Sequence, residues 1–343
     1  MEEKIDILSL SREELAQQLV SMGEKAFRAK QIYEWLHSKR ITDFSQMSNI
    51  SAQLRTELEK KFCIKSLNIK KRLVSDLDNT VKYLYGMPDG ESVETVLMEY
   101  KHGNSLCIST QVGCKMGCRF CASTIAGYVR DLLPSEMLLQ VYETERDSGR
   151  HVDSIVLMGI GEPLDNFDNV MKFLSLINDE GEGMSLRHIS LSTCGVVDKI
   201  YKLAELKTGL TLSISLHAAT DEKRSAIMPI NKRYDLSQLM KACRDYFKAT
   251  GRRISFEYSL IEGVNDTEES AQELIKLLGG MTCHVNLIPI NEIRERDFRK
   301  SRSVERFRKR LCDAGVNATV RRTLGADINA ACGQLRRDDG KSQ

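Results

Sequence analysis

The feature that most constrains the fold is a regular alternation of short apolar segments with amphipathic segments, which begins near residue 104. Several amphipathic segments start at Ser or Asp and stop at Gly, as capped helices do. Strands that alternate with helices indicate βαβ units around a parallel sheet, so we expect an α/β fold that is doubly wound or curled into a full or partial barrel. The expected strands lie at about residues 104–110, 152–159, 188–193, 210–218, 253–260, 284–290 and 317–323.

Reactive and polar residues follow several of these expected strands. Three cysteines come after the first strand and the segment GIGEP after the second, and Ser192, His217 and Asn291 come after the third, fourth and sixth. In barrels of parallel strands, active sites lie at the carboxyl ends of the strands. We therefore expect these residues to meet at one edge of the sheet.

The first hundred residues follow a different pattern. Ser11 and Glu14 form a capping box, and apolar residues at helical spacing continue to Phe62. Alternation and turn residues at 75–100 then predict a short piece of sheet. We expect a helical N-terminal accessory domain with this linking sheet at residues 1–90, and a catalytic core at residues 91–343.

The composition indicates an ordinary globular protein, with 41% hydrophobic and 29% charged residues in 343. The N-terminal residues do not have the pattern of a signal peptide, and no apolar run has the length of about 18 residues that a membrane helix needs. We therefore expect a cytoplasmic protein without a membrane anchor. In that compartment ten cysteines indicate metal ligands, catalytic thiols or buried small residues.

Basic residues gather in two segments, although the net charge is only +2. Six basic and no acidic residues lie between Lys60 and Arg72, and nine basic residues face four acidic ones from Glu292 to Arg310. Such clusters on a nearly neutral protein indicate a polyanion site, for which RNA is the commonest partner. A solvated helix face is an equally good interpretation of either cluster alone.

Cys114, Cys118 and Cys121 stand within eight residues in the segment CKMGCRFCAS. Their spacing would suit a buried stripe on a helix, but Gly113 and Gly117 each disfavour a helix by about 1 kcal/mol. Structural zinc usually has four ligands, and a complete four-cysteine iron–sulfur site would need a fourth cysteine at a regular spacing. The pattern favours a [4Fe–4S] cluster with one open iron, because an open position marks catalytic metal sites.

The CxxxCxxC motif is followed, after the next expected strand, by Gly161, Glu162 and Pro163. This pair of motifs resembles the radical SAM superfamily. The resemblance implies a partial (β/α) barrel and one cluster per chain, whose fourth iron binds the amino and carboxylate groups of S-adenosylmethionine (SAM). It also implies that the Gly-Glu-Pro motif holds the methionine amino group, and that the metal ligands are Cys114, Cys118 and Cys121.

Further motifs narrow the resemblance to the RlmN group of dual-specificity RNA adenine methyltransferases. This group methylates adenine carbon 2 in 23S rRNA near the peptidyl transferase centre and in the tRNA anticodon loop. Cfr-type relatives methylate carbon 8 of the same ribosomal adenosine and typically carry Gly-Glu-Ala, so Gly-Glu-Pro favours carbon 2. The motifs, in order, are ESVETVLMEY, SLCISTQVGCKMGCRFCAST, MGIGEPLDN, LSTCG, SLHAATDEKRSAIMPIN, HVNLIPIN and RRTLGADINAACGQL.

The resemblance also implies roles for two thiols outside the cluster. Cys332 would carry a methyl group taken from one SAM, and a radical made from a second SAM would activate that group for addition to adenine. Cys107 would then release the RNA by forming a disulfide with Cys332, and Glu94 would be the proton acceptor. We expect the segment around Cys332 to be mobile. The positions that match SAM contacts in the family are Ser192, Ser215, Leu216, His217 and Asn291.

The implied partners are 23S rRNA, tRNA and a low-potential electron donor such as flavodoxin or ferredoxin, and we expect a monomer. An interpretation from a different class is a non-catalytic iron–sulfur or zinc protein that binds RNA. Such a protein would have no need of Glu162, Cys107 or Cys332.

Overall fold

A ten-stranded sheet organises the structure, a computed structural model that describes residues 4–179 and 183–335. Seven neighbouring strands of this sheet are parallel, which confirms the strands expected from the sequence. In sheet order they are β6 (Gly103–Cys107), β9 (Ser154–Leu157), β10 (Ile189–Thr193), β11 (Thr211–Ser215), β12 (Ile254–Leu260), β13 (Cys283–Pro289) and β14 (Ala318–Val320).

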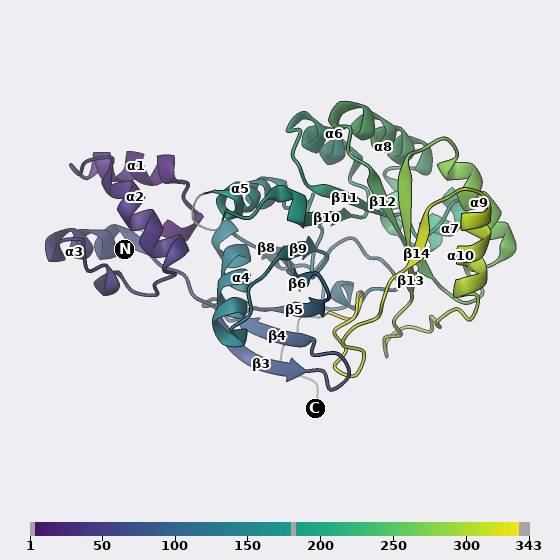
Figure 1. The fold of residues 1–343 in the computed structure, drawn as a ribbon, viewed down its shortest axis with the longest axis horizontal. Coiled ribbons are helices and arrows are strands. Elements are labelled where there is room, and N and C mark those ends of the chain that lie inside the picture. The colour runs from purple at the N-terminus through teal and green to yellow at the C-terminus, as the bar shows by residue number, and fades with distance from the viewer. Residues whose placement is uncertain (1–3, 180–182, 336–343) are drawn as a thin grey trace.

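Helices lie along the outside of the curved sheet, which gives the expected partial barrel (Figure 1). Their caps follow from the sequence: in α8, Asp235 and Gln238 form a capping box, and the helix stops at Gly251 with φ of 66°. The helices are α4 (Pro134–Ser148), α5 (Phe167–Asn178), α6 (Val197–Glu205), α7 (Asp221–Ile227), α8 (Leu236–Thr250), α9 (Glu268–Leu278) and α10 (Val304–Asp313).

Three antiparallel strands extend the sheet beyond β6: β5 (Ser92–Tyr100), β4 (Val81–Gly86) and β3 (Asn68–Val74). We call these strands and their connecting turns the antiparallel extension. The predicted domain boundary at residue 90 falls between β4 and β5, which pair along their whole length from Val81–Leu97 to Gly86–Ser92. The sheet therefore continues across that boundary.

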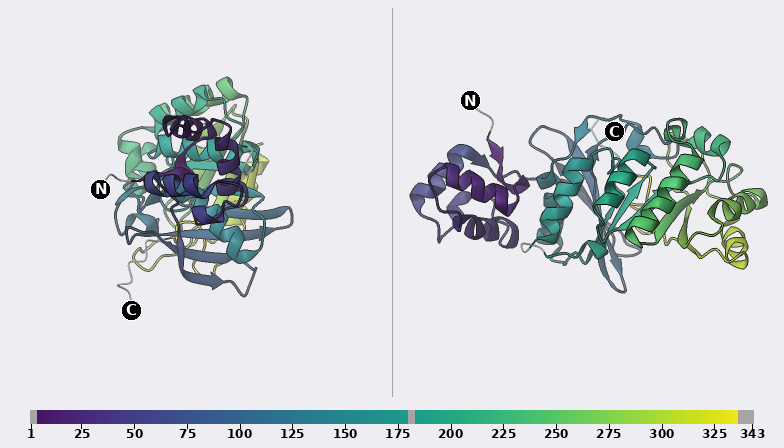
Figure 2. Two further views of the ribbon diagram at one scale, coloured as in Figure 1. Left: turned by 90° about the vertical axis from the view of Figure 1, so that its left-hand side faces the viewer. Right: turned by 90° about the horizontal axis from the view of Figure 1, so that it is seen from above.

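The N-terminal helices form a separate lobe that lies beside α4 and α5 (Figure 2). The capping box is confirmed, since Ser11 Oγ accepts from Glu14 N–H at 3.2 Å and Glu14 Oε2 accepts from Ser11 N–H at 2.7 Å. The elements are β1 (Ile5–Asp6), α1 (Arg12–Ser21), α2 (Arg28–Tyr33), a π-helical turn (Glu34–Ser38), α3 (Ala52–Lys61) and β2 (Phe62–Cys63).

Loops and a small ribbon close the inner side of the partial barrel. The ribbon pairs β7 (Gln111–Val112) with β8 (Arg130–Asp131), on either side of the cysteine loop. Residues 324–335, which we call the C-terminal segment, lie near the same loop. Among the described residues, no helix is long and apolar enough to cross a membrane.

Candidate active site

The carboxyl ends of the parallel strands surround a hollow, which we call the strand-end hollow. All three cysteines of the CxxxCxxC motif line it, although they come from a loop and not from a helix. Residues at or just after the ends of β9, β10, β11 and β13 complete its wall, so the expectation that these residues meet is confirmed for the following: Gly161, Glu162, Ser192, His217 and Asn291. Ser215, at the end of β11, also lines it.

The cysteine loop depends on two glycines at its turns. Gly113 and Gly117 have φ of 75° and 71°, a region that disfavours other residues. A Cβ atom on Gly113 would lie 1.7 Å from the carbonyl oxygen of Gly127, so the two backbone segments meet only because no side chain intervenes. The glycines that argue against a helix in the sequence thus shape the loop.

The three thiols fit an iron–sulfur cluster better than a single ion. Burial is the largest effect on the pKa of each of the three thiols, and it raises the pKa of Cys114 to about 12. The charges of the neighbouring thiols raise the pKa of Cys118 further. A cationic metal group offsets both effects and binds the thiolates. No three Cys, His, Asp or Glu side chains converge on one ion within the described ranges, whereas a four-iron cluster takes each thiolate on a different iron.

Glu162 is buried with both carboxylate oxygens held by backbone amides. Its Oε2 accepts from Cys194 N–H at 2.7 Å and its Oε1 accepts from Leu164 N–H at 3.0 Å. Burial raises the pKa of Glu162, and these hydrogen bonds oppose the shift. Gly161, with φ of 109°, lets the turn approach Gln111 closely, and Pro163 is buried behind the wall. The arrangement holds a carboxylate at the edge of the hollow, where an ammonium group would pair with it.

Four of the five expected SAM-contacting residues line the strand-end hollow. Ser192 Oγ and Ser215 Oγ lie 3.4 Å apart, and Asn291 Nδ2 donates to the carbonyl oxygen of Cys332 at 3.0 Å. The Nδ1 of His217 accepts from Ser259 N–H at 2.9 Å, and burial followed by the charge of Arg224 lowers the pKa of His217 to about 3. This imidazole is therefore neutral.

The fifth expected residue, Leu216, has its side chain in the core and does not line the hollow. Its N–H donates to Glu257 O at 3.0 Å and its carbonyl oxygen accepts from Arg224 Nε at 3.1 Å. Leu216 therefore positions its neighbours Ser215 and His217 through the backbone.

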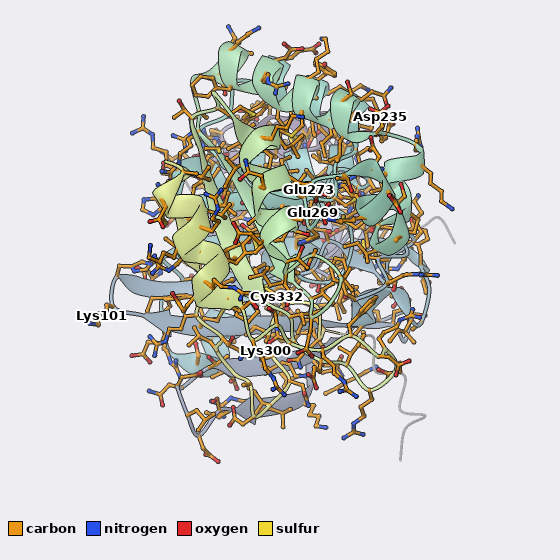
Figure 3. The ribbon with its side chains drawn as sticks, turned by 90° about the vertical axis from the view of Figure 1, so that its right-hand side faces the viewer. Lys101, Asp235, Glu269, Glu273, Lys300 and Cys332 are labelled. Atoms are coloured by element: carbon orange, nitrogen blue, oxygen red, sulfur yellow. The ribbon has the colours of Figure 1, made fainter. Side chains whose placement is uncertain are left out.

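A second, smaller hollow, which we call the thiol hollow, is lined by both Cys107 and Cys332. Cys332 also lines the strand-end hollow, so it borders both spaces. Both cysteines are free thiols. Burial, and then the charge of Cys332, raises the pKa of Cys107 to about 12. Figure 3 labels Cys332 near the middle of the view, between the helices and the strands of the antiparallel extension.

Hydrogen bonds from two sides hold the C-terminal segment. Ala122 N–H in the cysteine loop donates to Gly333 O at 2.8 Å, and Ser123 Oγ donates to Leu335 O at 2.7 Å. On the opposite side, Asp327 accepts from the hydroxyl and backbone of the turn between β3 and β4, with Ser75 Oγ at 2.7 Å. The expected mobility of this segment stays a prediction. Any such movement would have to break the hydrogen bonds described here.

Glu94 lies in a third hollow, on the sheet face of the antiparallel extension. Glu94 is buried, and its Oε1 is 3.0 Å from Lys82 Nζ. The C-terminal segment forms another wall of this extension hollow through Asn329 and Gln334. The structure therefore does not bring Glu94 into the two hollows that Cys332 lines.

Two protein families match the chain. The ribosomal RNA large subunit methyltransferase N-terminal domain matches residues 5–64, and the radical SAM superfamily matches residues 108–278. A probable dual-specificity RNA methyltransferase RlmN from Lachnoclostridium phytofermentans is 52% identical over 338 residues, which span 98% of this chain and 95% of that protein. A protein of the same description from Clostridium perfringens is 52% identical over 341 residues, 98% of each chain.

The chain belongs to the RlmN group of radical SAM RNA methyltransferases. SAM is therefore its cofactor and RNA its class of substrate. A crystal structure of a radical SAM methyltransferase from Sphaerobacter thermophilus has a TM-score of 0.92 at 39% identity and covers 96% of this chain and 99% of that one. Streptococcus suis SuiB, crystallised with SAM, shares the fold at a TM-score of 0.50 and 14% identity, over 64% of this chain and 50% of that one.

Two charged residues at the RlmN-type site escaped the sequence analysis. Glu257 on β12 lines the strand-end hollow, accepts from Asn286 Nδ2 at 2.8 Å and lies 3.8 Å from Arg321 Nη1. Arg321 borders both the strand-end and the thiol hollow. A signal for Glu257 was present, because a carboxylate inside an apolar strand is unusual unless it faces a polar site.

Proposed function

We propose that the chain methylates carbon 2 of adenosine in 23S rRNA and in tRNA, with Cys332 as the methyl carrier and Cys107 as the resolving thiol. The observation that carries the proposal is that two free thiols outside the CxxxCxxC motif line one hollow, and that one of them also borders the strand-end hollow. A metal-binding protein without this chemistry would have no use for such a pair.

In this proposal Cys114, Cys118 and Cys121 would hold a [4Fe–4S] cluster, which would supply an electron for the reductive cleavage of SAM. Glu162 binds the methionine amino group, since its buried carboxylate is already oriented by two amides. Ser192, Ser215, His217 and Asn291 orient the rest of SAM, with Pro163, Gly161 and Leu216 fixing the backbone around them.

Cys332 performs two tasks from one position. Its thiolate takes a methyl group from SAM, and the same sulfur later joins the protein to the methylene group on adenine. Cys107 attacks that sulfur, a disulfide forms, and the sulfur–carbon bond breaks. The methylene carbon leaves with the electron pair and takes up a proton, so the RNA is released with a methyl group. Glu94 accepts the proton from carbon 2, which requires the adenine to reach both sides of the C-terminal segment.

The RNA would reach the site across the antiparallel extension and the loop after β13. Lys71 and Arg294 line the extension hollow, and neither has an ion-pair or hydrogen-bond partner among the described residues. Three of the four basic residues of α10, Arg308, Lys309 and Arg310, are instead paired with nearby acids, as Lys309 is with Asp313 at 2.6 Å. We assign RNA contacts to the free cations and a solvated helix face to α10.

The remaining partners follow from the family resemblance. A flavodoxin or ferredoxin is the proposed electron donor, because reductive SAM cleavage needs an electron at low potential. We also propose a cytoplasmic monomer.

Anaerobic incubation of the reconstituted protein with SAM, dithionite and a 23S rRNA fragment or tRNA tests the proposal. Mass spectrometry of the digested nucleosides should show 2-methyladenosine with both RNAs. A product at carbon 8 would assign the chain to Cfr-type chemistry. Zinc in place of iron, with no methylated nucleoside, would support the non-catalytic RNA-binding alternative.

A further inference from the structure

Glu94 and Cys332 face different spaces, although the proposed reaction needs both at one adenine. Glu94 lines the extension hollow, whereas Cys332 lines the strand-end and thiol hollows. The C-terminal segment separates these spaces. A group that contacts both Glu94 and this segment would fix their relative position.

Lys82 is such a group. It lies on β4, and its side chain is only 10% exposed. Its Nζ is 3.0 Å from Glu94 Oε1 and donates to the carbonyl oxygen of Asn329 at 3.1 Å. Asn329 has φ of 51° and stands three residues before Cys332, so the ammonium binds the segment at a backbone turn close to the methyl carrier.

We propose that Lys82 is a positioning residue that holds Glu94 as a carboxylate and fixes the C-terminal segment beside it. The inference rests on the proposed role of Glu94 as proton acceptor. An ammonium at this distance favours the ionised carboxylate, which is the form that accepts a proton. The same ammonium sets the distance between the acceptor and the segment that carries Cys332.

The two contacts of Lys82 also link two successive steps of the proposed reaction. When the proton of adenine carbon 2 moves to Glu94, the carboxylate becomes neutral and its attraction for Lys82 falls. The ammonium of Lys82 retains its hydrogen bond to the carbonyl oxygen of Asn329. The C-terminal segment therefore stays in place during the step in which Cys107 must reach the sulfur of Cys332. A residue that only stabilised the fold would not link these two steps.

Three substitutions separate the two contacts of Lys82. Lys82→Met removes both contacts, Lys82→Gln keeps a hydrogen-bond donor without a charge, and Lys82→Arg keeps the charge. Lys101→Met is the control, because Lys101 is exposed in the turn between β5 and β6 (Figure 3). Thermal melts of each variant identify any general loss of fold. If Lys82→Met unfolds, the assays are carried out with Lys82→Gln and Lys82→Arg.

The holoenzyme of each variant is assayed for kcat and KM with tRNA and for hydrogen exchange of residues 325–331. In Lys82→Met, kcat should fall about 100-fold, the scale of a lost general base, while KM for tRNA stays within about twofold. Exchange in the segment should rise about tenfold. Lys82→Arg should restore kcat to within about fivefold, and Lys82→Gln should lower kcat with a smaller rise in exchange.

S-methylation of Cys332 with SAM alone should persist in Lys82→Met, since the contacts of Asn291 and Ala122 with the segment remain. The inference is overturned if Lys82→Met keeps the wild-type kcat, if exchange does not change, or if Arg fails to restore activity. Glu94→Gln tests the proposed function separately. Full RNA methylation by Glu94→Gln would reject Glu94 as proton acceptor, and the exchange measurement would still decide whether Lys82 holds the segment.

Discussion

The strand-end hollow and the extension hollow lie on opposite sides of one short segment, but they are built from different residues. The strand-end hollow is lined by thiols, glycines, small polar groups and apolar side chains such as Phe120 and Ile288. Its charged side chains, Glu162, Glu257 and Arg321, have partners inside the protein. The extension hollow contains Lys71 and Arg294, whose side chains have no ion-pair or hydrogen-bond partner in the part of the chain that the structure describes. The parallel strands therefore enclose the site that we propose for radical chemistry, while the extension hollow offers cations suited to the proposed RNA contact.

The sharpest test of this contrast is Cys118→Ala. Without one of three thiolates the cluster should not assemble, so SAM cleavage and RNA methylation should both disappear while RNA binding through the extension hollow remains. The wild-type protein, isolated without oxygen, should be brown and contain about four irons per chain. Iron analysis and detection of 5′-deoxyadenosine measure the effect. Continued formation of 5′-deoxyadenosine by the variant would show that the cluster ligands are wrong.

Substitutions of the two thiols should stop the proposed reaction at two different steps. Cys332→Ala should remove S-methylation and all RNA methylation while iron content stays normal. Cys107→Ala should stop turnover after the bond to RNA has formed, because the attacking thiol is missing. Protein and RNA should then migrate together on a denaturing gel, and normal turnover without such an adduct would rule out Cys107 as the resolving thiol.

Charge reversal should affect the extension hollow alone. Lys71→Glu and Arg294→Glu should each raise KM for tRNA about tenfold and reduce the slope of log K against log salt by about one. Lys309→Glu on α10 is the matched control, since Lys309 is already paired with Asp313. SAM cleavage without RNA should be unchanged in all three variants. Equal effects of Lys71→Glu and Lys309→Glu would remove the distinction between free and paired cations.

The smallest expected effect concerns the stability of the C-terminal segment at low pH. The hydrogen bond from Ser75 lowers the pKa of Asp327 from its usual 3.8, so the folded state favours the carboxylate. A lowered pKa gives stability that is complete above the ordinary value and lost as pH falls through the lowered one. Limited proteolysis of the C-terminal segment should therefore increase only below about pH 4.

Asp327→Asn provides the control for this acid effect. The segment of this variant should be cleaved faster at every pH, without the additional increase in acid. A wild-type protein whose segment is cleaved equally at pH 3 and pH 6 would contradict the prediction.

The sequence predicted the parallel strands because each is a short apolar run bounded by turns, a pattern imposed by burial on both faces. Strand β3 was missed, since Asn68–Val74 is an exposed edge strand rich in Lys and Arg. The thiols and Glu162 were recognisable because their motifs are local. Lys82 and Arg321 were not, because their roles depend on partners outside any local motif: Asn329 follows Lys82 by 247 residues, and Glu257 lies on β12 whereas Arg321 follows β14.

The contacts between the antiparallel extension and the C-terminal segment have a consequence for how the protein is made. Ser75, Asp78 and Lys82 bind Asp327, Gly325 and Asn329, which follow them by about 250 residues. Contacts of such long sequence separation form late, and synthesis proceeds from the N-terminus. Each newly made chain therefore folds most of its sheet before Cys332, the proposed methyl carrier, has left the ribosome. A chain released early would have the strands proposed to bind SAM but not the thiol proposed to alter RNA.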